Sequence, residues 1–341
     1  MSSSNRIEWI DILKGFAAIF VILGHALHTT WFKTWIYLFH LGLFFFASGY
    51  LLNVTKYRSA KIFAVRKVRT VVLPYIQYSL LIVIFMIFWE FFKNDGSSIY
   101  DILNHACLRF VSIFVQMRGT VFQGYCWFLP VLFLAECLFF VLYRFLSDRV
   151  FLFHFVILLL FSIGYLYQSF IHISLLWNVD LVFIIIPIID FGYICRTYNL
   201  SFNNLCYAVG ALFISIGFSI YQYNSFFRVD IFENSIGNPV AFLLGNIVGI
   251  YFFCSIAVLI RNNILLSYIG KNSIRFYTLH RPIVFYPVSL VLSHCLSSFH
   301  YNNEIIELYL VPLALSIISV VIIYVICFLL GFFSLKCNNT I

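Results

Sequence analysis

Long apolar runs alternate with short polar connections along the whole chain. Ten of these runs have about the length that a helix needs to cross a bilayer. We therefore expect transmembrane helices at about 9–30, 35–54, 71–92, 127–146, 150–168, 179–197, 203–222, 238–260, 275–296 and 306–333. No internal repeat or linker divides the chain, so residues 1–341 are expected to form one domain, an all-α polytopic bundle in a membrane.

The composition excludes a soluble globular fold. The chain has 341 residues, of which 63% are hydrophobic and only 10% are charged, whereas soluble domains carry about 25% charged residues. The net charge of +8 lies mostly in connections, and no soluble basic domain is present that could bind nucleic acid. The nine cysteines show no metal-ligand spacing, so we expect no bound metal. The first apolar run lacks the layout of a signal peptide and should be retained.

The distribution of lysine and arginine predicts the orientation. The connection from 55 to 70 contains six cations and no acid, which indicates a cytoplasmic location. Counting the ten helices from that connection places both termini in the cytoplasm. The composition suggests a bacterial inner membrane.

The first apolar run carries four ionisable residues that a simple membrane anchor does not need: Asp11, Lys14, His25 and His28. Each such group costs free energy in a bilayer and is usually kept for a function. At about 100° per residue, the four fall within an arc of roughly 100°, and Lys14 and His25 lie about 16 Å apart along one face. Asp11 and Lys14 could alternatively form an interfacial pair that reaches water, but that leaves His25 unexplained.

His25 is a candidate general base. A neutral histidine in a partly dry cavity can take a proton from a hydroxyl group and return it to a leaving group near neutral pH. The angular argument assumes that the helix is continuous at Gly15 and Gly24.

The basic connection contains a pair of arginines, Arg66 and Arg69, directly before a helix that opens with Leu73-Pro74-Tyr75. Two arginines three residues apart lie on one side of a helical turn and can bind phosphate groups in a bidentate manner. A phosphorylated cytosolic donor would fit here. The alternative is that the cations only contact anionic lipid head groups.

Further polar or aromatic residues suggest acceptor binding. His40 lies as far beyond the first hairpin as His25 lies before it, and Trp127 could stack on a sugar or simply anchor the chain at the interface. Glu136 lies near mid-membrane, where a carboxylate is costly. His280 precedes Arg281 and the helix-kinking Pro282.

These residues resemble the signature of the acyltransferase-3 family of integral membrane acyltransferases. In that signature a basic residue is followed by ten residues and a histidine, with an aspartate three positions before the basic residue. Here it is Asp11, Lys14 and His25. Similar features follow in order and span most of the chain, although 150–240 matches none: Phe39-His40 with Ser48-Gly49-Tyr50, Arg66 and Arg69 before Pro74-Tyr75, Trp127-Phe128-Leu129, and Gly270-Lys271-Asn272-Ser273 leading to His280.

The resemblance implies a ten-helix transferase that takes an acyl group, commonly acetyl, from cytoplasmic acyl-CoA as co-substrate, with no tightly bound cofactor. The acceptor would be a hydroxyl group of a cell-surface or lipid-linked glycan. His25 would be the catalytic histidine, Asp11 and Lys14 its partners, and Arg66 and Arg69, with Lys14, the CoA site. Longer members carry an esterase-like domain at the C-terminus, which we do not expect here.

Several alternatives remain open at this stage. Transfer could be direct or could pass through an acyl-histidine. The acceptor could be a lipopolysaccharide unit, a capsule or exopolysaccharide repeat, or a common-antigen sugar. The same intramembrane charges could also serve a transporter or flippase for lipid-linked sugars, although that class predicts inverted repeats. A non-catalytic membrane partner would not need the polar face of the first helix.

Overall fold

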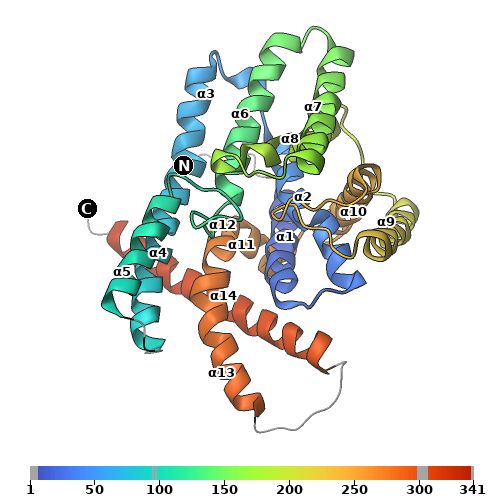
Figure 1. Ribbon diagram of the computed structural model, residues 1–341. Helices are drawn as coiled ribbons and strands as arrows, with labels where there is room; N and C mark the ends of the chain where they lie inside the picture. Colours follow the sequence, from blue (N-terminus) through green and yellow to red (C-terminus); the bar gives the residue numbers. More distant parts are fainter. Residues whose placement is uncertain (1–6, 94–95, 97, 298–305, 339–341) are drawn as a thin grey trace.

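The computed structural model describes residues 7–93, 96, 98–297 and 306–338, and these residues form a bundle of helices (Figure 1). The first two helices, α1 (Glu8–Ala26) and α2 (Trp31–Leu51), run through its middle. The other long helices are α4 (Leu73–Lys93), α6 (Phe128–Leu146), α7 (Val150–Phe170), α8 (Val179–Thr197), α9 (Leu205–Phe226), α10 (Pro239–Leu259) and α14 (Val311–Asn338).

Nine helical segments within the described residues are long and apolar enough to cross a membrane, which confirms the all-α polytopic class. The expected helix at 275–296 is present but is not α-helical throughout. It consists of α12 (Ser273–Leu279), a π-helical turn (His280–Phe285) and α13 (Tyr286–Ser297). Pro282 lies in this turn and has no amide hydrogen to donate to the helix. This region is not among the candidate membrane spans found within the described residues.

The basic stretch is a helix and not the loop that its charges suggested. Helix α3 (Ala60–Lys67) passes through a π-helical turn (Val68–Val72) into α4 without a break. Phe63 of α3 is buried and stacks on Phe140 of α6 with ring centroids 4.4 Å apart. Phe63 therefore packs α3 against the bundle, and the ion pair of Lys67 with Glu136 joins the same two helices.

The amphipathic helix α5 (Ile99–Ser112) was not anticipated from the apolar pattern. It begins with a capping box, in which the Ser98 side chain accepts from the Asp101 amide and the Asp101 carboxylate accepts from the Ser98 amide. Such a box satisfies two backbone donors at a helix start. The helix packs beside α4 (Figure 1).

Helix α1 is continuous through Gly15 and Gly24. Gly15 faces the main chain of Leu266 in α11 (Ile264–Lys271), and a Cβ on Gly270 of α11 would collide with the carbonyl oxygen of Asp11. These two glycines bring α1 and α11 into direct backbone contact. The angular relation between Lys14 and His25 is therefore preserved in the folded chain.

The helices α2 and α8 form the buried centre. The most apolar windows of α2 and α8 are 78% and 72% buried, compared with 22% for α7. Gly49 of α2 lies against the carbonyl of Ile189, and Gly192 of α8 lies against the main chain of Phe46. Small residues allow such close helix contact in membranes.

Candidate active site

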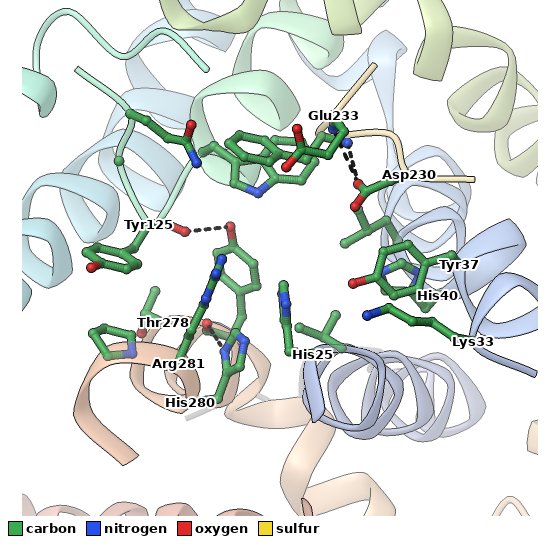
Figure 2. Close-up of a pocket in the computed structure, with 18 of the residues that line it drawn as sticks. His25, Lys33, Tyr37, His40, Tyr125, Asp230, Glu233, Thr278, His280 and Arg281 are labelled. Carbon is green, nitrogen blue, oxygen red and sulfur yellow. Dashed lines mark hydrogen bonds between the residues drawn. The ribbon is translucent and has the colours of Figure 1, made fainter. Parts of the chain in front are cut away.

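A cavity of about 490 Å³ is lined by three histidines, His25, His40 and His280, and is called here the histidine cavity (Figure 2). Its walls come from α1, α2, the connection before α6, the connection after α9, and the π-helical turn at His280–Phe285 together with the helices on either side of it. Residues far apart in the sequence thus meet at one site.

His25 lies deep inside the protein, yet its side chain remains accessible because it faces this cavity. Its ring stacks on that of His280, with centroids 5.0 Å apart and planes inclined by 28°. His28 lies in the connection that follows α1. It is exposed and lies outside the cavity lining.

Backbone carbonyls orient the other two histidines. The Nδ1 atom of His280 lies 2.6 Å from the carbonyl oxygen of Tyr277, and Nδ1 of His40 lies 3.0 Å from that of Ile36. A carbonyl only accepts, so each Nδ1 carries the hydrogen and each neutral ring keeps Nε2 as an acceptor. The buried Nε2 of His280 has no protein partner among the described residues. This nitrogen is thus a buried acceptor whose lone pair no described protein donor satisfies.

Charged side chains of both signs complete the histidine cavity (Figure 2): Lys33, Arg228, Asp230, Glu233 and Arg281. Arg228 donates to Asp230 at 2.7 Å. Lys33 donates to the carbonyl of Leu27 at 2.8 Å and lies 5.3 Å from the ring centroid of Tyr37. Donors and acceptors are mixed here, as binding of a polyhydroxylated ligand requires.

Sequence reasoning did not assign these charged residues to the site. Arg228, Asp230 and Glu233 lie in a polar connection, where no apolar run or motif marks them. Their position depends on the connection after α9, where Asp230 pairs with Ser235 through two main-chain hydrogen bonds. Among these charged residues, only Arg281 could have been recognised from the sequence, because it directly follows His280.

The connection before α6 supplies aromatic groups to the histidine cavity. Trp127 is buried, and its ring lies 4.8 Å from that of Phe232. The hydroxyl groups of Tyr125 and Tyr286 lie 3.3 Å apart, and burial, together with this contact, raises the pKa of the Tyr125 phenol. Tyr125 therefore stays protonated at neutral pH. Trp127 thus lines the histidine cavity as a buried ring.

A buried network holds this connection in place. Arg118 forms an ion pair with Asp180 of α8, and its amide donates to the side chains of Ser174 and Asn178 at 3.0 Å each. Both charges are almost fully buried. A buried pair that is also hydrogen-bonded rigidifies the segments it joins. Asp180 is thus a structural residue that links α8 to the wall of the histidine cavity.

A second cavity, of about 690 Å³, contains five cations among its described lining residues and is called here the basic cavity. These cations are Lys14, Lys56, Arg66, Lys67 and Arg196, and the one carboxylate in this lining is that of Glu136. Such a charge excess favours a ligand with several negative charges.

The predicted arginine pair is divided by the structure. Arg66 lines the basic cavity and lies 5.7 Å from the ring centroid of Tyr57. Arg69 is exposed and is not part of the lining. Lys67 lines the cavity instead, and its ammonium group lies 2.5 Å from the carboxylate of Glu136. The π-helical turn that begins at Val68 rotates Arg69 away from the position expected for a regular helix.

Glu136 lies in the basic cavity and not with the acceptor candidates His40, Trp127 and His280. It is 3% exposed and accepts hydrogen bonds from Lys67 and from the Ser48 hydroxyl. The structure therefore associates Glu136 with the cationic side of the protein.

The three residues of the first-helix signature are also separated. Lys14 lines the basic cavity, with its Nζ 3.8 Å from a carboxylate oxygen of buried Asp11. His25 lines the histidine cavity three turns further along α1. Asp11 and Lys14 thus lie too far from His25 to contact the same reacting atoms. Asp190 of α8 hydrogen-bonds to His154 at 2.7 Å and lies outside both cavities.

The apolar helices define a multi-pass integral membrane protein, and two polar cavities lie between its helices. The acyltransferase domain family matches residues 7–332, which is almost the whole chain. The chain therefore belongs to the acyltransferase-3 family and is a membrane acyltransferase, which requires an acyl donor and an acceptor. Comparisons with curated proteins and with solved structures found no match.

Proposed function

We propose that the chain transfers an acyl group, acetyl in the first instance, from acyl-CoA to a hydroxyl group of a cell-surface or lipid-linked saccharide. The main support is that two chemically different cavities share one helix. Lys14 lines the basic cavity and His25 the histidine cavity, about 16 Å apart along the axis of α1. A donor with a charged end and a distant reactive end fits this arrangement.

The basic cavity is the proposed binding site for the phosphates of the donor, on the side that the charge distribution predicts to be cytoplasmic. Arg66 and Lys67 reach it from α3, and Arg196 reaches it from α8. Arginine binds phosphate oxygens through a planar set of donors, and several cations together hold a multiply charged group. Lys14 would bind the donor as well, and Asp11 would position Lys14 through their contact.

The histidine cavity is the proposed acceptor site. His25 would act as general base, with its imidazole taking the proton of the acceptor hydroxyl as the oxygen attacks the thioester carbon. The carbon–sulfur bond then breaks, and the proton passes from His25 to the departing thiolate. Lone pairs on His40 and His280, and the ring of Trp127, would hold the rest of the saccharide.

Transfer of label tests this function. Membranes that contain the chain are incubated with acetyl-CoA labelled in the acetyl group, and surface polysaccharide is assayed for alkali-labile label. We expect label in the polysaccharide, and none when the same CoA is labelled in its adenine ring. Absence of label from the polysaccharide when the acetyl group is labelled would contradict the proposal. Movement of lipid-linked sugar across the membrane without acetyl-CoA would favour a transporter instead.

A further inference from the structure

Tyr277 is the described residue that lines both cavities. It belongs to α12, is 7% exposed, and packs against Phe128 with ring centroids 5.3 Å apart. On the other side its ring lies 6.2 Å from that of His280, which in turn stacks on His25. A thioester that extends from the basic cavity toward His25 must therefore reach the reacting position beside Tyr277.

The hydroxyl group of Tyr277 is held as a hydrogen-bond donor. It accepts from the amide of Phe128 at 3.1 Å. Phe128 is the first residue of α6, where backbone amides lack helical partners and carry partial positive charge. This bond occupies a lone pair of the hydroxyl oxygen and polarises its O–H bond. The hydroxyl hydrogen points to the carbonyl of Tyr125 across a long distance of 3.4 Å, so a better acceptor can replace that carbonyl.

We infer that Tyr277 is a catalytic hydrogen-bond donor that stabilises the oxyanion formed on the thioester carbonyl. The inference rests on the proposed function. As the acceptor oxygen bonds to the carbonyl carbon, the π-electron pair of the carbonyl group moves to the carbonyl oxygen. The proton of the acceptor's hydroxyl group moves to His25. Tyr277 donates its hydrogen bond to that oxygen and keeps its own proton. The electron pair then returns, the carbon–sulfur bond breaks, and the thiolate takes the proton from His25.

Other donors are less well placed for this role. Arg281 and Lys33 line only the histidine cavity, and Arg66 and Lys67 line only the basic cavity. An oxyanion donor must be fixed before the reaction, at the position where charge develops. Tyr277 meets this requirement because Phe128 fixes its hydroxyl and because it lies at the boundary between donor and acceptor.

The test compares Tyr277→Phe with wild type in membranes, measuring initial rates of acetyl transfer to membrane polysaccharide over a range of acetyl-CoA concentrations. We expect kcat to fall about 10²- to 10³-fold, as is typical when one oxyanion donor is removed, with little change in the KM for acetyl-CoA. Tyr75→Phe is the structural control, because the Tyr75 hydroxyl is also buried and bonded but lies outside both cavities. It should keep its kcat.

Inhibition by a trifluoromethyl ketone analogue of acetyl-CoA gives a second readout, because its hydrate has a tetrahedral carbon. Tyr277→Phe should weaken its inhibition strongly while the affinity for CoA is kept. Three results would overturn the role of Tyr277 but leave the proposed function intact. They are a kcat of Tyr277→Phe near the wild-type value, an equal loss of kcat in Tyr75→Phe, and unchanged inhibition of Tyr277→Phe by the ketone. No transfer by wild type would overturn the proposed function and this inference with it.

Discussion

The imidazole rings of His25 and His280 stack in the histidine cavity with their centroids 5.0 Å apart. They come from opposite ends of the chain, and only the folded bundle brings them together. The carbonyl of Tyr277 fixes the orientation of His280, so its buried Nε2 is left as an acceptor without a protein partner among the described residues. His25 would then remove a proton from one hydroxyl group of the acceptor, while His280 accepts a hydrogen bond from another.

His280→Ala should therefore impair acceptor binding more than donor binding. Loss of one hydrogen bond to a neutral group corresponds to about 1 kcal/mol, or roughly a five- to tenfold higher KM for the acceptor. The KM for acetyl-CoA should not change. Transfer kinetics at varied polysaccharide concentration measure this effect. A selective rise in the KM for acetyl-CoA would place His280 on the donor side and contradict the assignment.

Arg66→Gln should weaken donor binding. Hydrogen bonds to charged groups contribute about 1.5–3 kcal/mol, so the Kd for CoA should rise roughly ten- to hundredfold. Isothermal titration of the protein in nanodiscs measures this constant, and the effect should diminish with added salt.

Two variants of neighbouring cations serve for comparison. Lys61 is exposed on the same helix and outside the basic cavity, so Lys61→Gln should leave the Kd for CoA unchanged. Arg69→Gln should have a smaller effect than Arg66→Gln. Equal losses in all three variants would indicate a general surface-charge effect and would remove the specific role of Arg66.

The ion pair between Lys67 and Glu136 predicts a non-additive effect on stability. Lys67→Met leaves the nearly buried Glu136 carboxylate without its cation, which should lower the free energy of unfolding by about 3 kcal/mol. Lys67→Met combined with Glu136→Gln should recover most of this loss, because no uncompensated charge remains. Thermal unfolding in detergent measures both. Additive losses in the double variant would show that the two side chains do not act as a pair.

The contact between α1 and α11 predicts a large difference between glycines. Gly270→Ala places a Cβ against the main chain of α1 at Asp11, where backbone cannot easily move, and should destabilise the protein by several kcal/mol or abolish folding. Gly210→Ala, in α9, meets no atom within 4 Å and should stabilise by about 0.5–1 kcal/mol. Thermal unfolding ranks the two variants. Equal stability would contradict the packing described for α1 and α11.

The fold was largely predictable because apolar length is a direct consequence of the bilayer. The predicted elements differ from the observed ones where something other than apolar length determines the helix. The six cations at 55–70 indicated a connection without a helix. Helix α3 forms there because Phe63 packs on Phe140. The departure from α-helical geometry at His280–Phe285 is a π-helical turn that Pro282 alone does not predict. Helix α5 is too short and too polar to resemble a membrane span.

The site was predictable only in part, for a similar reason. Buried charges and histidines in apolar runs are conspicuous, so His25, His40 and His280 could be selected as candidates, and they share one cavity. Asp230 and Glu233 lie in an ordinary polar connection, where nothing local shows that the chain folds back over that cavity. Tyr277 resembles any other aromatic residue of a membrane helix. Its place between two cavities is a property of the tertiary structure.

The central claim is that His25 is the general base for transfer from acyl-CoA. The direct test is the rate of acetyl transfer from labelled acetyl-CoA to surface polysaccharide in membranes that carry wild type, His25→Ala or His28→Ala at equal amounts of inserted protein. His28 follows the same end of α1 but lies outside the cavity lining. We expect His25→Ala to reduce the rate by about 10²- to 10⁴-fold and His28→Ala to keep it. Full transfer by correctly inserted His25→Ala would contradict the claim.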